Sequence, residues 1–214
     1  MIPIPNESEC VLILVRHGAT ENNLADPPIL QGRSANPGLS ETGRKQARSS
    51  ARQLEEIDIA SVFASPLVRA VETAEIIAEP HRLQVNQVSE LTEVDVGEWE
   101  NRSWVHIAVE DPEAYDKFMS NPAENGYLGG ESFNDVYNRV APAMTHLLES
   151  NLGKTIVVVA HNIVNRVLLA NAIGIPIARA RDISQENCGI NILKFENGKS
   201  KLKTLNTTFH LPFD

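Results

Sequence analysis

The sequence has few cysteines and few basic residues, and each shortage excludes a class of protein. Its two cysteines, Cys10 and Cys188, form no Cys-x-x-Cys pair, so neither a zinc knuckle nor a disulfide framework is predicted. We expect two reduced, buried thiols in a cytoplasmic protein. Lysine and arginine number 19 against 28 aspartates and glutamates, which gives a net charge of −9. A nucleic-acid partner usually needs a basic patch, so none is expected.

Long apolar runs are also missing. The longest, at 11–15 and 156–160, are far shorter than the ~20 residues that a membrane-spanning helix needs. The N-terminus, Met-Ile-Pro-Ile-Pro, lacks the basic region and the apolar run of a signal peptide. We therefore expect a cytoplasmic protein with no membrane partner. A hydrophobic fraction of 42% and a charged fraction of 22% are typical of a soluble domain with a packed core.

Apolar, β-branched runs predict the strands of a sheet. Four such runs lie at 11–15, 59–64, 84–88 and 155–160, the third being the weakest. Continuous apolar strands of this kind are typical of a parallel sheet that is covered on both faces. Near the end of the chain, residues 190–195 and 201–205 flank Asn197-Gly198. Asn-Gly between apolar runs is a strong hairpin signal, so an antiparallel pair is expected there.

Helices are predicted between these strands from apolar residues at helical spacing. They start at Ser40, Pro66, Ser132 and His161, where the serines suit an N-cap and the proline suits a first turn. The expected buried residues are Ala47, Ala51 and Leu54; Leu67, Ala70, Ala74 and Ile77; Val136, Val140, Met144 and Leu147; and Val164, Leu168 and Ala172. Pro142 should bend its helix or delay the start of that helix.

The predicted fold class is α/β, because strands alternate with helices along most of the chain. We expect a single three-layer domain over residues 1–214, with a mostly parallel central sheet, helices on both faces and a C-terminal antiparallel hairpin. Residues 21–39 are rich in Asn, Pro and Gly and should form a loop. Residues 89–131 interrupt the alternation with one short helix near 104–118, and we predict a variable lid or insert there.

Polar residues follow three of the predicted strands, and ligands in such sheets bind outside the carboxyl ends of the strands. Arg16-His17-Gly18 follows the first strand, residues 65–69 follow the second, and His161-Asn162 follows the fourth. Arginine forks match tetrahedral oxyanions, and the two helix N-termini add backbone donors. The pattern predicts a phosphate site in which a neutral imidazole can act as the nucleophile.

The same residues belong to a set of motifs that resembles the histidine phosphatase superfamily, branch 1, the phosphoglycerate mutase-like group. Residues 16–23 match R-H-G-x-[ST]-x-x-N. Further matching blocks lie at 31–32, 39–43, 46–47, 65–70, 73–74, 91–93, 97, 99–100, 130–132 and 159–161. The blocks follow in the expected order over nearly the whole chain, which makes the resemblance specific.

The resemblance implies a role for each matching position. His17 would be the phosphorylated nucleophile, and Glu93 the proton donor that later activates water. Substrate-binding residues would be Arg16, Asn23, Gln31, Gly32, Arg69, His161 and Asn162. No metal and no cofactor would be required, because the arginines and His161 neutralise the phosphate. Since Glu93 must start the reaction protonated, we expect the best activity at mildly acidic pH.

Three functions remain open at this stage. The preferred one is a phosphoric monoester hydrolase acting on a small-molecule phosphate monoester. The alternatives are a cofactor-dependent phosphoglycerate mutase, which would need more cations than Arg102 and Lys117 in 100–131, and a non-catalytic module that binds phosphorylated ligands. A homodimer is compatible with the sequence.

Residues 105–131 bear on the choice of substrate. They hold six carboxylates (Glu110, Asp111, Glu113, Asp116, Glu124 and Glu131) and one lysine. If they face the pocket, they should repel a polyanionic leaving group and favour a neutral organic part. His106 lies in the same stretch and is a candidate for substrate contact, whereas His81, His146 and His210 should be surface or packing residues.

Three positions depart from the family pattern. Asn162 stands where the family has Gly, Asn36 where it often has Asp, and Asn101 where it has the Gly of W-E-G. Asparagine tolerates unusual backbone angles better than most residues, so the turns should survive. The Asn162 side chain should also be able to reach the pocket. We expect these changes to affect substrate choice more than the chemical step.

Overall fold

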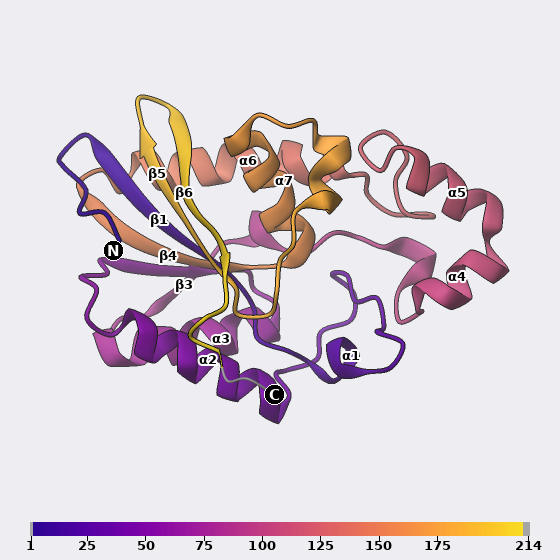
Figure 1. The fold of residues 1–214 in the computed structure, drawn as a ribbon, viewed down its shortest axis with the longest axis horizontal. Coiled ribbons are helices and arrows are strands. Elements are labelled where there is room, and N and C mark those ends of the chain that lie inside the picture. The colour runs from indigo at the N-terminus through magenta and orange to yellow at the C-terminus, as the bar shows by residue number, and fades with distance from the viewer. Residues whose placement is uncertain (1, 212–214) are drawn as a thin grey trace.

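The computed structural model describes residues 2–211, and their central feature is a six-stranded sheet between two layers of helices (Figure 1). The strands are β1 (Glu9–Arg16), β2 (Ser61–Ala64), β3 (Val85–Gln87), β4 (Lys154–Ala160), β5 (Ile190–Glu196) and β6 (Lys199–Thr207). Their order is β3-β2-β4-β1-β5-β6. The pairs β3–β2, β2–β4 and β4–β1 are parallel, and β5 is antiparallel to β1 and β6. The predicted α/β fold with a mostly parallel sheet is confirmed.

The C-terminal hairpin turns at the predicted Asn-Gly pair. Asn197 and Gly198 have φ angles of 52° and 73°. Positive φ at both central residues is the geometry of a type I′ turn, whose twist matches that of the flanking strands. Strands β5 and β6 are longer than predicted, because the ladder continues right up to the turn.

Four helices cover the two faces of the sheet: α2 (Glu41–Leu54), α3 (Val68–Ala78), α6 (Phe133–Glu149) and α7 (Asn162–Ile173). Figure 1 shows α2 and α3 on one side of the sheet and α6 and α7 on the other. Ser40 and Ser132 cap α2 and α6 as predicted, each hydroxyl accepting a hydrogen bond from the backbone N–H three residues later.

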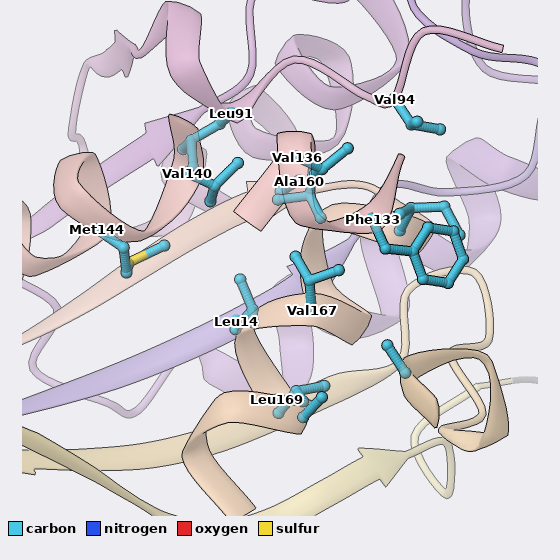
Figure 2. Close-up of a cluster of buried hydrophobic side chains, with 14 of the residues drawn as sticks. Leu14, Leu91, Val94, Phe133, Val136, Val140, Met144, Ala160, Val167 and Leu169 are labelled. Carbon is cyan, nitrogen blue, oxygen red and sulfur yellow. The ribbon is translucent and has the colours of Figure 1, made fainter. Parts of the chain in front are cut away.

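The alternation of side chains along β1 divides the core into two layers. Val11, Ile13 and Val15 pack toward α2 and α3. Leu12 and Leu14 point the other way, into the cluster shown in Figure 2, where residues of α6 and α7 surround them. Because β1 is buried on both faces, its carboxyl end at Arg16 is held rigidly.

The predicted helix start at Pro66 was wrong. Of the two alternatives predicted for Pro142, the delayed start was wrong and the bend stays a prediction. Pro66 lies outside α3, which begins at Val68, because the amides of Leu67 and Val68 bond instead to the side chains of Ser65 and Asn36. Pro142 does not delay α6. It is exposed on the outer side of that helix, where water can satisfy the carbonyl that lost its partner.

Smaller differences concern the core and the loops. Leu148, rather than the predicted Leu147, occupies the core position near the end of α6, while Leu147 is half-buried. Within the predicted loop 21–39, the chain forms one short helix, α1 (Glu21–Leu24). Four 3₁₀ segments complete the chain: η1 (Glu79–His81), η2 (Ser89–Leu91), η3 (Gly97–Trp99) and η4 (Ile177–Asp182). Within 2–211, no helix combines the length and apolar character that spanning a bilayer would require.

The predicted single helix near 104–118 is two helices. They are α4 (Trp104–Glu110) and α5 (Pro112–Ser120), and Asp111 lies between them. Pro112 takes the first position of α5, where its missing N–H costs nothing, and so separates the two helices. Both lie beyond the end of the sheet, at the right of Figure 1. We call residues 104–127 the cap.

Candidate active site

The site lies where β1, β4 and the loop before β5 meet. His17 directly follows β1, and His161 directly follows β4. The centroids of their rings are 5.1 Å apart, and both side chains are almost fully buried. The carboxyl ends of parallel strands thus bring the two predicted histidines into contact.

Gly18 allows the chain to pass close to the first turn of α2. A Cβ built on Gly18 would lie 2.6 Å from the carbonyl oxygen of Gly43, closer than such atoms can approach. The amide of Gly18 donates to the Thr73 hydroxyl of α3 at 3.0 Å. The glycine of the R-H-G motif is therefore required by packing against two helices, and this packing fixes the backbone of His17.

Two neighbours define the protonation of His17. Its Nδ1 lies 2.7 Å from the carbonyl oxygen of Gly18, which can only accept, so Nδ1 carries the proton. Nε2 lies 3.3 Å from the Nε–H of Arg69, which can only donate. Burial, and then the charges of Arg69 and Arg16, hold the pKa of His17 well below its ordinary value. The ring is therefore neutral, with a lone pair on Nε2.

The two arginines beside His17 are themselves held in place. Arg69 is fully buried and donates to the carbonyl oxygens of Ala35 and Gly32 at 3.0 and 2.9 Å. Arg16 donates to the Gln185 carbonyl at 2.6 Å. Burial lowers the pKa of each guanidinium to about 10, so both remain charged at neutral pH. They make this pocket a strongly positive one.

Glu93 faces the same site from the segment after η2. Its two carboxylate oxygens accept from the amides of Val94 at 2.9 Å and Ile163 at 3.3 Å. Arg139 of α6 donates to the Glu93 carbonyl at 3.1 Å and also forms an ion pair with Glu131 at 2.8 Å. Arg139 therefore fixes the backbone that carries Glu93. Glu131, which lies in the motif block 130–132, therefore stabilises that arrangement.

Six of the predicted site residues line one cavity of about 490 Å³, namely Arg16, His17, Asn23, Gln31, Glu93 and Asn162. Arg69 and His161 both contact His17, but neither is among the residues that line this cavity. Both ring nitrogens of His161 are buried without a hydrogen-bond partner among residues 2–211. Gly32 also lies outside the wall, because its amide bonds to Glu100 and its carbonyl to Arg69, so the geometry gives it a supporting position.

The cap forms the apolar wall of this cavity. Its lining residues are Trp104, Tyr115, Phe118, Met119 and Tyr127. None of the six carboxylates of 105–131 lines the cavity, so they give no reason to expect a neutral organic part, and that argument was wrong. His106 is exposed on α4, with its Nδ1 3.1 Å from the Ser103 hydroxyl, and does not line the cavity either. Whether the cap closes over a ligand stays a prediction.

The structure adds cavity residues that the sequence did not reveal. Arg166 of α7 and Arg181 of η4 line the wall. Arg166 lies one helical turn after Asn162, a spacing that would have placed both on one face of α7. Asn187 donates to the His17 carbonyl at 3.0 Å, and no signal in the sequence identifies it, because the antiparallel β5 brings this distant loop to the site.

The three asparagines that depart from the family pattern occupy distinct places. Asn101 has a φ of 61°, so it takes the left-handed conformation that the usual glycine would adopt. Asn36 accepts from the Val68 amide at 2.8 Å and thereby caps α3 next to Arg69. Asn162 opens α7 in an ordinary helical conformation, with a buried side-chain oxygen that has no partner within 2–211.

Comparisons with known proteins agree with this architecture. Residues 12–208 match the model of the histidine phosphatase superfamily, branch 1. Phosphoserine phosphatase 1 of Hydrogenobacter thermophilus is 31% identical over 202 residues, covering 94% of this chain and 93% of that protein. A protein named probable phosphoglycerate mutase in Salmonella paratyphi A is 32% identical over 187 residues, covering 87% and 85%. The crystal structure of a phosphoserine phosphatase from Entamoeba histolytica with 3-phosphoglyceric acid superposes with a TM-score of 0.83, 28% identity and coverage of 95% and 100%.

Proposed function

Because the chain belongs to branch 1 of the histidine phosphatase superfamily, we propose that it hydrolyses small phosphate monoesters through a phosphohistidine on His17. The observation that carries the proposal is the state of His17, which is neutral, with its Nε2 lone pair beside two charged arginines and on the wall of a cavity that also holds Glu93. A neutral imidazole needs no further base to attack phosphorus.

In the first step, Nε2 of His17 attacks phosphorus and the bond from phosphorus to the ester oxygen breaks. The leaving oxygen takes a proton from Glu93. Nδ1 of His17 keeps its proton and donates it to the Gly18 carbonyl oxygen, so the ring is held in orientation while it carries the phosphoryl group. Arg16, Arg69 and His161 donate to the phosphoryl oxygens, where charge develops in the transition state.

In the second step, the Glu93 carboxylate takes a proton from water, and that water oxygen attacks phosphorus. The bond between Nε2 and phosphorus breaks, which releases inorganic phosphate and restores neutral His17. Glu93 is protonated again and ready for the next ester. The two steps together consume one water and one ester, with no net change in the protein.

The test is hydrolysis of 4-nitrophenyl phosphate by the wild type and by His17→Ala, with His146→Ala, an exposed histidine of α6, as the matched control. We expect the His17 variant to lose at least about 10⁴-fold in kcat, as removal of a nucleophile does elsewhere, and the control to keep its rate. Rapid quenching followed by mass spectrometry should find the phosphoryl group on the peptide that contains His17. Full activity of His17→Ala would refute the mechanism.

The same preparation distinguishes hydrolysis from mutase activity. Lys117 is exposed and Arg102 is tied to Glu110 and Asp111, so neither cation of the cap region lines the cavity. Arg166 and Arg181 are the cations on the wall besides Arg16 among the described residues, and both lie outside 100–131. We expect 3-phosphoglycerate to release inorganic phosphate faster than it is isomerised, with or without bisphosphoglycerate. Isomerisation faster than hydrolysis would replace the phosphatase proposal by the mutase.

A further inference from the structure

Arg166 and Asn162 form a polar pair on the wall of the cavity that the chemistry described above does not use. They lie one turn apart on α7 and both face the cavity. Nε of Arg166 and the side-chain oxygen of Asn162 are buried atoms without a hydrogen-bond partner within residues 2–211. Buried polar atoms are normally paired, so the two atoms mark a place where a ligand can bond.

The charges around Arg166 leave it without a counter-ion. It forms no ion pair with any described residue, although Glu93, Glu186 and Asp182 act on it from farther away. Arg16 repels it across the site, and Arg181 adds a third guanidinium to the wall. The sole carboxylate on this wall is Glu93. The cavity is therefore positive at two places, one at Arg16 and one at Arg166.

A bound phosphoryl group would neutralise the positive charge at Arg16 but not the positive charge at Arg166. In the proposed function, its charge is matched by Arg16 and Arg69, and Glu93 is protonated when the ester binds. Arg166 would then be a partly buried cation with no partner, which is costly. A second anionic group on the substrate removes that cost, and a carboxylate fits the guanidinium fork by two parallel hydrogen bonds.

We infer that Arg166, together with Asn162, binds a carboxylate on the organic part of the substrate. This inference rests on the proposed function, and it makes the preferred substrates phosphate monoesters of hydroxy acids or hydroxy amino acids. Arg166 donates to the carboxylate oxygens, and Asn162 orients the polar group next to them. Because Arg16 and Arg166 line the same cavity, one small molecule can present its phosphate to Arg16 and its carboxylate to Arg166.

Two esters that differ in one group test the inference. 3-Phosphoglycerate carries a carboxylate where glycerol 3-phosphate carries a hydroxymethyl group. We expect the wild type to prefer the first in kcat/KM, and Arg166→Gln to reduce that preference by roughly 30-fold or more, mainly through KM. Arg166→Lys, which keeps the charge but loses the fork, should restore part of it. Arg48→Gln removes an exposed arginine of α2 and should leave the preference unchanged.

Binding separates this inference from the proposed function. Calorimetric titration of His17→Ala with each ester reports recognition without turnover, and the double variant His17→Ala/Arg166→Gln reports the part due to Arg166. If neither ester is hydrolysed but the double variant loses selectivity for 3-phosphoglycerate, the proposed function fails and the carboxylate site stands. If the wild type shows no preference for the carboxylate, or if Arg166→Gln weakens both esters equally, the inference is wrong.

Discussion

The two ends of the cavity differ in the kind of side chain that forms them. At one end, His17, Arg16 and Glu93 are buried charged or polar groups, and each is held by backbone carbonyls or amides at the ends of strands or the start of a helix. At the other end, the cap is an aromatic cluster in which the rings of Phe118 and Tyr127 have centroids 4.4 Å apart. Directional hydrogen bonds fix geometry more tightly than apolar contacts do. The difference suggests that one end performs the chemistry and the other adapts to the organic group.

We call the end of the cavity that holds His17, Arg16 and Glu93 the chemical end. Among the variants that keep His17, Glu93→Gln should cause the largest loss of activity there. The amide keeps an oxygen that can accept from Val94 or Ile163 but cannot protonate a leaving alkoxide. We expect kcat for an alkyl phosphate to fall by roughly 10²–10⁴-fold. The loss should be much smaller for 4-nitrophenyl phosphate, whose leaving group needs no proton. Equal losses for both esters would contradict the role of Glu93 as an acid.

Arg69→Met should have the next largest effect, because it removes a donor to the phosphoryl group and a positive neighbour of His17. We expect kcat/KM to fall by about 10²–10³-fold. The pH profile gives a second readout. The pKa of His17 is lowered by burial and by Arg69, so its protonation limits activity only below pH 6.5 in the wild type.

In Arg69→Met one cause of this depression is lost, so the pKa of His17 rises and the acid limb of kcat/KM moves to higher pH. The lowered pKa of His17 also makes stability depend on pH. A histidine whose pKa is lower in the folded state destabilises the fold as pH falls, and the loss should begin at higher pH in the wild type than in His17→Ala. An acid limb that stays in place would show that Arg69 does not act on His17.

Phe118→Ala perturbs the cap instead. Its ring packs against Trp99, Trp104 and Tyr127, so truncation should cost about 3–5 kcal/mol of local stability. We expect hydrogen exchange to accelerate within the cap and KM to rise about tenfold or less, with kcat nearly unchanged. Val109→Ala is the control, because Val109 is 76% exposed on α4. A kcat loss as large as that of Glu93→Gln would show that the cap also contributes to the chemical step, which would contradict the distinction between the two ends.

Substitution of Asn101 should have the smallest effect of these variants, and that effect should be on the free energy of unfolding. Asn101 is exposed, follows η3 and has a left-handed conformation, and its side chain accepts from Asn22 at 3.4 Å. We expect Asn101→Ala to lower the free energy of unfolding by about 1 kcal/mol, and Asn101→Gly to change it by less than about 0.5 kcal/mol. Urea denaturation at two protein concentrations measures both values. Equal destabilisation by the two variants would show that the contact with Asn22, not the backbone angle, matters.

The chemical end could be predicted from the sequence because its residues sit at the ends of apolar strands. His17 and His161 follow β1 and β4, and a parallel sheet brings such ends together whatever the loops do. The supporting residues could not be found in this way. Arg139 reaches Glu93 from the middle of α6, and Asn187 reaches His17 through an antiparallel strand that returns 170 residues later. The spacing of residues along the sequence does not predict these contacts.

The cap was the least predictable region. Pro112 divides what we predicted as one helix into α4 and α5. Acidic residues there suggested an acidic wall, but none of these carboxylates lines the cavity, whereas aromatic rings do. Which face of a short helix is buried depends on the rest of the fold. Composition alone therefore predicted an acidic cavity wall where the wall is apolar.

The hydrogen bond from the Ile163 amide to Glu93 has a consequence for how this protein can change its specificity. The donor is backbone, so any residue except proline at 163 can supply it. The neighbouring positions on the same helix, Asn162 and Arg166, face the cavity through their side chains. In the proposed mechanism, mutation can therefore exchange the side chains at 162 and 166 that would meet the organic part while Glu93 keeps its orientation. A single helix thus lets substrate range evolve independently of the reaction.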